Sequence, residues 1–176
     1  TLPAHRSLVE QLQARTVGRE YLALCLGALT GGGTIDAPIG RHPRQRKKMA
    51  VMNHGGKAAV THYRIAERFR HYTLLRVKLE TGRTHQIRVH LAHRHYPLVG
   101  DPVYGGRLRL SAGASDILID ALRAFRRQAL HARALELLHP ATGEPMAFEC
   151  PLAADFAGLL DVLRSEDPAG SAGRSR

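Results

Sequence analysis

Residues 81–106, TGRTHQIRVHLAHRHYPLVGDPVYGG, decide how the chain is interpreted. The turn at residues 81–83 (TGR) follows an alternating apolar segment. Thr84 is a residue type that caps helix N-termini, so a helix is expected over residues 85–93. Arg88 lies within about the first turn of that helix, where backbone N–H groups favour anions. The segment therefore predicts a strand–turn–helix junction at which an arginine meets a carboxylate or a phosphate.

Four histidines in this stretch raise the question of a metal site: His85, His90, His93 and His95. Their spacing matches neither HExxH nor a CxxC pattern, and no cysteine is near them. Helix-end and backbone hydrogen bonds explain such histidines without a metal, above all His93 and His95. No metal is therefore expected. The chain also has no GxSxG elbow, and the glycines at 31–33 are not followed by the GK[ST] of a phosphate-binding loop.

Upstream of the junction, alternation predicts two paired strands. Residues 57–68 (KAAVTHYRIAER) and 71–80 (HYTLLRVKLE) both alternate apolar and polar positions, which is typical of an antiparallel hairpin. Residues 19–29 are expected to form a buried strand, and residues 3–14 a short amphipathic helix. Residues 34–56 contain prolines, glycines and a basic cluster, so a long arm or loop outside the core is expected there.

Downstream of the junction, residues 105–128 are expected to be loop with one helical stretch around 117–125. Two further strands are predicted over 129–138 and 145–150, joined by a turn, followed by a closing helix over 155–163. Strands outnumber helices and neighbours pair locally. The expected class is α+β, with a mainly antiparallel mixed sheet flanked by helices and loops. The 176 residues fit one domain, expected over 1–163, with a disordered tail over 164–176.

Composition excludes several classes of protein. The apolar fraction of 44% excludes wholesale disorder. No apolar run approaches the ~18–20 residues that span a bilayer, so no membrane partner is expected. Two cysteines, Cys25 and Cys150, cannot build a disulfide scaffold and form no CxxC pair. That usage fits a reducing compartment, and a cytoplasmic location is expected.

The charge is the sharpest compositional signal. Lys and Arg number 26 against 15 Asp and Glu, which gives a formal net charge of +11. Two stretches, 37–66 and 81–100, contain no acidic residue at all. A charge run is often only a solvated face, but two in one small domain favour a polyanionic partner, and RNA or DNA is the first hypothesis. The basic residues of the first stretch that are expected to contact nucleic acid are Arg41, Arg44, Arg46, Lys47 and Lys48.

Residues 81–106 resemble the corresponding motif of the RluA family of pseudouridine synthases. Four more blocks resemble the same family in the same order: REYLAL at 19–24, GGGTIDAPIGRHPRQRKKMAV at 31–51, GKAAVTHY at 56–63 and RQALHARALELLHPATGE at 127–144. The resemblance covers about residues 3–163. It implies the pseudouridine synthase fold and the isomerisation of specific uridines to pseudouridine in RNA. The implied partner is looped large-subunit ribosomal RNA, and no cofactor is implied.

The resemblance also implies roles for individual residues. Tyr21 matches the active-site tyrosine, and Leu130 resembles the apolar residue that packs beside it, although both would also suit an ordinary core. Arg88 matches the arginine that pairs with the catalytic aspartate and keeps that carboxylate ionised. Arg83, His85 and Gln86 either hold the turn of the motif together or contact RNA; both roles stay open. Asp101 matches a structural position of the family.

One block of the family pattern is absent. The nucleophilic aspartate of the family lies in an HRLD-type motif, which this sequence does not contain, and none of its seven aspartates has a context that could replace it. The chain is therefore expected to be the C-terminal part of a catalytic domain, inactive alone, with HRLD and commonly an S4-like domain upstream. The main alternative is a noncatalytic RNA-binding fragment or pseudoenzyme of the same fold. A metal-dependent nucleic-acid enzyme would require a metal bound at the histidines.

Overall fold

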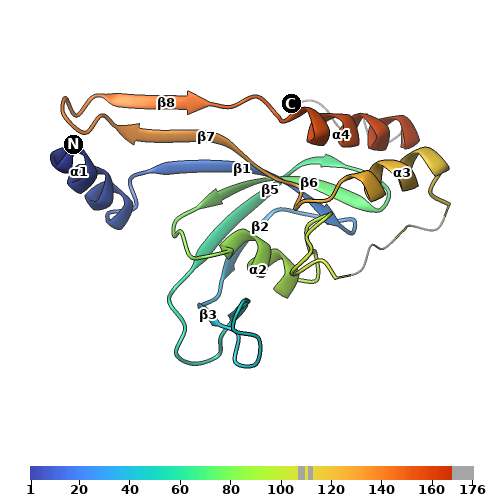
Figure 1. Ribbon diagram of the computed structural model, residues 1–176, viewed down its shortest axis with the longest axis horizontal. Coiled ribbons are helices and arrows are strands. Elements are labelled where there is room, and N and C mark those ends of the chain that lie inside the picture. Colours follow the sequence, from blue (N-terminus) through green and yellow to red (C-terminus); the bar gives the residue numbers. More distant parts are fainter. Residues whose placement is uncertain (107–109, 111–112, 168–176) are drawn as a thin grey trace.

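The computed structural model describes residues 1–106, 110 and 113–167. Its helices and strands follow in the order α1 (Leu2–Gln13), β1 (Gly18–Leu26), β2 (Gly33–Asp36), β3 (Ile39–Arg41), β4 (Met49–Val51), β5 (Val60–Arg68), β6 (Tyr72–Leu79), α2 (Gln86–His93), α3 (Asp116–Ala124), β7 (Leu130–Leu138), β8 (Pro145–Glu149) and α4 (Ala154–Glu166). Six strands form one sheet in the order β2-β5-β6-β1-β7-β8, and β3 pairs with β4 in a separate hairpin (Figure 1). The strand pairs among the described residues are antiparallel. The expected α+β class with a mainly antiparallel sheet is confirmed.

The central strand β1 separates two cores because its side chains alternate between the two faces of the sheet. Leu24 is buried in a cluster with α3 and α4 on one face. Ala23 and Cys25 are buried in a second cluster with Ile87 and Leu91 of α2 on the other face. Helices α4 and α2 accordingly lie on opposite sides of the sheet (Figure 1). Candidate site residues Tyr21 and Leu130 pack on the α2 side.

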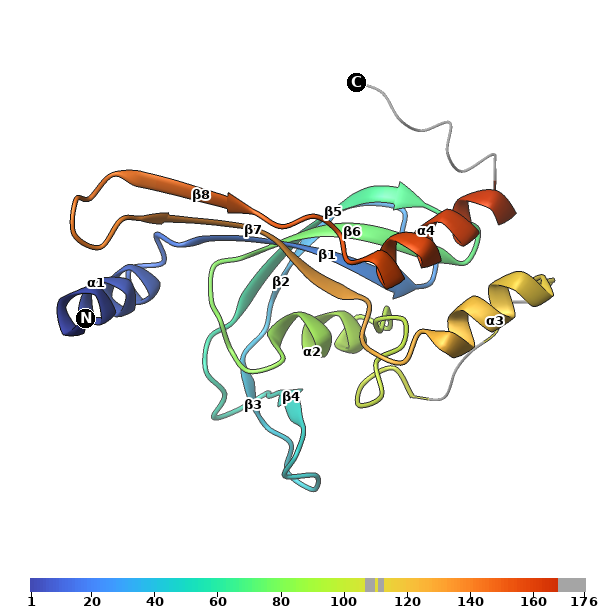
Figure 2. The same ribbon diagram turned by 45° about the horizontal axis from the view of Figure 1, so that its top comes forward.

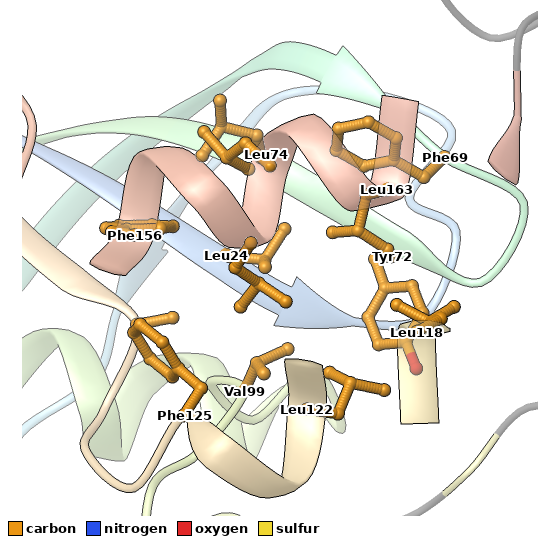
Figure 3. Close-up of a cluster of buried hydrophobic side chains, with 13 residues drawn as sticks. Leu24, Phe69, Tyr72, Leu74, Val99, Leu118, Leu122, Phe125, Phe156 and Leu163 are labelled. Atoms are coloured by element: carbon orange, nitrogen blue, oxygen red, sulfur yellow. The ribbon is translucent and has the colours of Figure 1, made fainter. Parts of the chain in front are cut away.

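The cluster beneath α4 fixes the end of the sheet that this helix covers. Phe156 is fully buried, and its ring lies 5.9 Å from that of Phe125 between ring centroids. Leu24 and Leu74 rise from neighbouring strands to meet these rings (Figure 3). Each buried side chain of this size contributes about 1.5–3 kcal/mol relative to the exposed state. The cluster therefore anchors α4 over β1 and β6.

The expectation of a long arm outside the core at residues 34–56 was wrong in part. Three short strands, β2, β3 and β4, occupy the segment, and Ile39 is 1% exposed against Ala59 and Val89. Ile39 also exchanges two backbone hydrogen bonds of 2.9 Å with Lys57. Its side chain and backbone thus bind the segment to the α2 side of the domain. Figure 2 shows the β3–β4 hairpin extending past α2. Arg44, Arg46, Lys47 and Lys48 lie in the sequence between these two strands.

Several element ends differ from the expectation, and strand β5 begins at Val60 rather than at residue 57. Strand β1 ends at Leu26 rather than at residue 29, because Gly27 has a φ of 99° and breaks the extended conformation. Helix α4 continues to Glu166, so the expected tail was wrong for residues 164–166. Arg164 secures that last turn by ion pairs with Glu67 (2.8 Å) and Asp161 (2.9 Å). The rest of the expected tail, 168–176, lies outside the described residues.

No helix in the described part of the chain is long and apolar enough to cross a membrane.

Candidate active site

The turn before α2 is closed by Gln86 rather than by the expected cap at Thr84. The N-cap position is His85, which has a φ of 57° and makes no capping side-chain hydrogen bond. The Gln86 Oε1 atom accepts hydrogen bonds from the Thr81 hydroxyl (2.7 Å) and from the Arg83 backbone N–H (2.9 Å). The expectation of Thr84 as the cap was therefore wrong, because a glutamine amide inside the helix supplies the acceptor.

The other half of the Gln86 amide joins α2 to β5. Its Nε2 donates to the Val60 carbonyl (2.9 Å) and to the Thr61 Oγ1 (3.0 Å), and the residue is 3% exposed. All four hydrogen bonds that an amide side chain can make are thereby formed within the chain. Of the two roles open for Gln86, this geometry accounts for holding the turn and leaves no polar atom for RNA.

His90 continues the same chain of hydrogen bonds. Its Nε2 lies 2.9 Å from the Ala37 carbonyl, which can only accept, so Nε2 carries the proton. Its Nδ1 then accepts from the Thr61 hydroxyl at 2.8 Å, while Thr61 accepts from Gln86. Burial lowers the pKa of His90, which is fully buried. A neutral His90 therefore links α2, β5 and the segment after β2.

The histidines of this stretch have separate surroundings. Both ring nitrogens of His90 are used as described, and His85 bonds to the Tyr104 hydroxyl at 3.0 Å. His93 and His95 are exposed. Within the described ranges, no three His, Cys, Asp or Glu side chains are grouped as a metal site would need. The four histidines are thus not brought together.

The neutral state of His90 predicts a pH dependence of stability. Its pKa in the folded protein is lowered from the ordinary value of about 6.5, so the unfolded chain takes up the proton first as pH falls. The free energy of unfolding should be at its full value above about pH 6.5 and fall as pH drops through the folded-state pKa. Urea denaturation between pH 8 and 5 measures this. His90→Gln should flatten the curve, whereas His54→Gln at an exposed position should keep it. Equal curves for wild type and His90→Gln would contradict the assignment.

Arg88 is paired with Asp101 within the chain. The Arg88 Nε and Nη2 atoms donate to the two carboxylate oxygens at 2.8 Å each, and the side chains are 9% and 0% exposed. Asp101 also accepts backbone N–H groups of Val103 (2.9 Å) and Tyr104 (3.0 Å). Burial alone would raise the pKa of Asp101, but the hydrogen bonds from Arg88 and the backbone lower it. The carboxylate therefore stays ionised and holds one edge of the guanidinium.

Tyr104 connects this pair to the basic hairpin. Its ring lies 5.0 Å from the Arg88 guanidinium carbon, a cation–π distance. Its hydroxyl accepts from the Met49 backbone N–H at 2.9 Å and lies 3.0 Å from the His85 Nδ1. Burial lowers the pKa of His85, which favours the neutral ring that can accept the hydroxyl proton. Sequence reasoning did not single out Tyr104; the only signal was its place in the DPVYGG block.

Tyr21 and Leu130 lie on the same face of the sheet, on neighbouring strands. Tyr21 is opposite Ala132, and Ala23 is opposite Leu130, so the two candidate side chains are diagonal neighbours across β1 and β7. Both are partly buried against the cluster that contains Ile87, the residue before Arg88. The structure therefore brings the three residues Tyr21, Leu130 and Arg88 to the α2 side of the sheet.

The basic residues divide into anchored and open ones. Arg83 donates from Nε to the Ala58 carbonyl (3.0 Å), and Arg41 donates to the Arg46 carbonyl (3.0 Å). Arg44, Arg46 and Lys47 are exposed, and their side chains make no hydrogen bond or ion pair with the described residues. The hairpin turn thus presents unpaired cations to solvent beside the Tyr104 contact.

Comparison with known proteins identifies the family to which the chain is similar. A model of the RNA pseudouridylate synthase family matches residues 1–93. "Ribosomal large subunit pseudouridine synthase D" of Pseudomonas aeruginosa is 64% identical over 166 residues, which cover 94% of this chain and 52% of that protein. The protein of the same name from Xanthomonas campestris is 58% identical over 176 residues, 100% of this chain and 53% of that protein. The chain therefore spans about half the length of the curated relatives it matches.

Solved structures agree on the fold. Human RNA pseudouridylate synthase domain containing 4 aligns with a TM-score of 0.69 at 27% identity, covering 90% of this chain and 67% of that chain. Human RNA pseudouridylate synthase domain containing 1 aligns with a TM-score of 0.65 at 24% identity, covering 91% and 71%, and this second likeness concerns the fold alone.

Proposed function

The chain belongs to the RNA pseudouridylate synthase family, and from this premise we propose that it is the C-terminal part of a catalytic domain that isomerises specific uridines of large-subunit ribosomal RNA to pseudouridine. The names of relatives that are 58–64% identical support this activity over a noncatalytic RNA-binding role. The nucleophilic aspartate would come from an HRLD motif upstream of Thr1 in the full-length protein. The chain supplies the tyrosine, the arginine and the apolar wall.

The single observation that carries the proposal is that only one edge of the Arg88 guanidinium is hydrogen-bonded to the described residues. Asp101 takes the Nε–Nη2 edge, and the Nη1 atom makes no hydrogen bond with any described residue. Arginine has a second edge that suits a carboxylate. A second carboxylate at Nη1 would have its pKa lowered by the guanidinium and so stay ionised, as a nucleophile requires. Asp101 would act as the positioning residue for this contact.

The proposed reaction exchanges one glycosidic bond for another. The C1′–N1 bond breaks with help from the upstream aspartate, the uracil turns in the pocket, and a C1′–C5 bond forms. The proton of C5 leaves and N1 gains one, so no electrons and no phosphoryl group are transferred. Tyr21 would pack against the uracil and take part in the proton transfer from C5, with Leu130 beside it. Removing the target base from its stack costs a few kcal/mol in a duplex and less in a loop.

RNA binding by the hairpin turn predicts a measurable salt effect. Replacing Arg44, Arg46, Lys47 and Lys48 together by Ala should flatten the plot of log K against log[salt] for the full-length protein. The expected change is up to about 0.9 per lost duplex phosphate contact, or ~0.7 for a single strand. Removing four exposed arginines elsewhere should change the slope less, and the control set is Arg6, Arg70, Arg123 and Arg126. Equal slopes for the two variants would mean that the turn is only a solvated surface.

The proposed activity is tested by pseudouridine mapping on unmodified large-subunit ribosomal RNA. The full-length protein should convert its target uridines, and the 176-residue chain should convert none because it contains no HRLD motif. Turnover by the pure 176-residue chain would contradict the missing nucleophile. RNA binding without turnover by the full-length protein would favour the noncatalytic alternative.

A cytoplasmic location belongs to the same proposal. Both cysteines, the buried Cys25 and the exposed Cys150, are free thiols. Free thiols are typical of a reducing compartment.

A further inference from the structure

The face of the sheet opposite α2 carries a stack of basic side chains in which the two arginines have no carboxylate partner among the described residues. Strands β5 and β6 pair with Arg64 directly opposite Arg76 and with His62 directly opposite Lys78. Residues two apart on a strand point to the same face, so the two pairs form successive rungs about 7 Å apart. Like charges placed directly opposite each other destabilise a sheet. The fold therefore tolerates a repulsion that an anionic ligand would relieve.

The two nearby carboxylates, Glu20 and Glu80, contact Lys78 and His62 of the stack but neither Arg64 nor Arg76. Glu20 forms a 2.6 Å ion pair with Arg133 and lies 3.9 Å from the Lys78 ammonium. Glu80 lies 2.5 Å from the His62 ring and 3.7 Å from Arg15. Arg64 and Arg76 are exposed, and neither makes an ion pair or side-chain hydrogen bond with the described residues. Two guanidinium groups are thus free to bind an anion.

These rungs line a hollow that the helices leave open. The hollow has a volume of about 800 Å³ and is bounded by β1, β2, β5 and β6. Helix α4 covers the neighbouring end of the same face, where Leu74 is buried and Arg164 binds Glu67, whereas Arg76 is exposed. Figure 1 shows α4 confined to that end of the sheet.

Gly32 lines the hollow next to Arg64, where a side chain would not fit. A Cβ atom at Gly32 would meet the Tyr63 carbonyl oxygen at 2.8 Å and the Cγ of Arg64 at 3.6 Å. Residue 32 therefore carries no side chain that would crowd the arginine. The Arg64 guanidinium keeps its approach from solvent.

We propose that this cleft binds the backbone phosphates of RNA, on the face of the sheet opposite the candidate active site. Arg64 and Arg76 would each contact a phosphate, with Lys78 next to them on the following rung. Guanidinium groups suit phosphates because they offer paired N–H donors in a planar fork. The cleft would hold a part of the RNA remote from the reacting uridine. The proposal rests on the proposed function only in its choice of RNA as the polyanion.

The test compares two doubly substituted forms of the full-length protein. Arg64→Gln with Arg76→Gln removes the cleft cations, and Arg6→Gln with Arg70→Gln removes two exposed arginines elsewhere. Binding of a fluorescent uridine-rich single-stranded RNA is measured from 50 to 300 mM salt. The plot of log K against log[salt] has a negative slope. The magnitude of this slope should decrease by up to about 1.4 in the cleft variant, at ~0.7 per lost single-strand contact. The magnitude of the slope should decrease less in the control variant. Equal slopes for the cleft variant and the control variant would overturn the proposal.

Thermal unfolding without RNA distinguishes two possible occupants of the cleft, which are RNA and an acidic segment of the protein itself. Loss of the like-charge repulsion should leave the cleft variant at least as stable as the wild type. A lower Tm for the cleft variant alone would show that an acidic segment of the protein itself occupies the cleft, which would also overturn the proposal. Pseudouridine formation by the wild type is measured separately. A flattened slope without turnover would therefore reject the proposed function and keep the cleft, and turnover with equal slopes would do the reverse.

Discussion

Arg88→Lys in the full-length protein is expected to lower the single-turnover rate of pseudouridine formation by on the order of 10²-fold, because a misplacement of about 1 Å can cost that much. The guanidinium has two tasks at once. Its Nε–Nη2 edge is held by Asp101 at 2.8 Å, and its Nη1 is left for the nucleophilic carboxylate. A lysine ammonium keeps the charge but not the planar fork, so it cannot hold both carboxylates in fixed positions.

The Arg88 variants also predict a change in the pH profile. A neighbouring positive charge lowers the pKa of a carboxylate, so Arg88→Ala should raise the pKa of the nucleophile and shift the acid limb of the rate profile to higher pH. Arg88→Lys should shift that limb less. Arg94→Lys, at the exposed end of the same helix, is the matched control and should keep the wild-type rate. If Arg88→Ala binds RNA much more weakly yet reacts at the normal rate once bound, Arg88 is a phosphate contact and the assignment is wrong.

Asp101→Ala is expected to lower the free energy of unfolding by about 3–5 kcal/mol, the range for breaking a buried ion pair by removing one partner. The substitution leaves the Arg88 guanidinium 9% exposed without its counter-ion. It also removes the acceptor of the Val103 and Tyr104 backbone N–H groups. Chemical denaturation of the full-length protein at pH 7 measures the loss.

An exposed ion pair provides the control for this prediction. Asp155 binds Arg127 with the same two-pronged geometry, at 2.6 and 2.7 Å, but at the surface. Asp155→Ala should therefore cost much less, because water screens that pair. The pKa of Asp101 is lowered in the folded state, so its contribution is present above about pH 4 and is lost as pH falls through the folded-state pKa. Equal losses of unfolding free energy in Asp101→Ala and Asp155→Ala would mean that burial does not increase the contribution of Asp101 to stability.

Patterns of side-chain alternation were enough to predict the main strands. Residues 57–68 and 71–80 predicted the β5–β6 hairpin because apolar and polar residues alternate along much of both strands, although residues 72–75 are buried on both faces. Strands β2, β3 and β4 were missed because three or four residues are too few to show a period, and prolines and basic residues dominate their surroundings. Helix α2 was predicted, but its capping was not, because the acceptor comes from a buried amide.

The candidate site was predictable only as a set of residue types. The family motif pointed to Tyr21, Leu130 and Arg88, and the antiparallel register places the first two on one face. The Arg88–Asp101 pair joins helix α2 to the loop that follows it, and neither periodicity nor composition relates the two residues. The Tyr104 contact with Met49 likewise depends on how the hairpin β3–β4 returns toward α2. Such partners follow from tertiary packing alone.

The position of β1 in the middle of the sheet has a consequence for the order of folding during synthesis. The β5–β6 hairpin joins neighbouring segments and closes a short loop, so it can form early. Strand β1 is made well before β7, yet its Gly18 lies opposite Glu136 of that strand. One edge of β1 thus stays unpaired until β7 has been synthesised, and an open strand edge invites association with other chains. Slow translation between β6 and β7 would therefore prolong the interval in which the nascent chain is prone to aggregate.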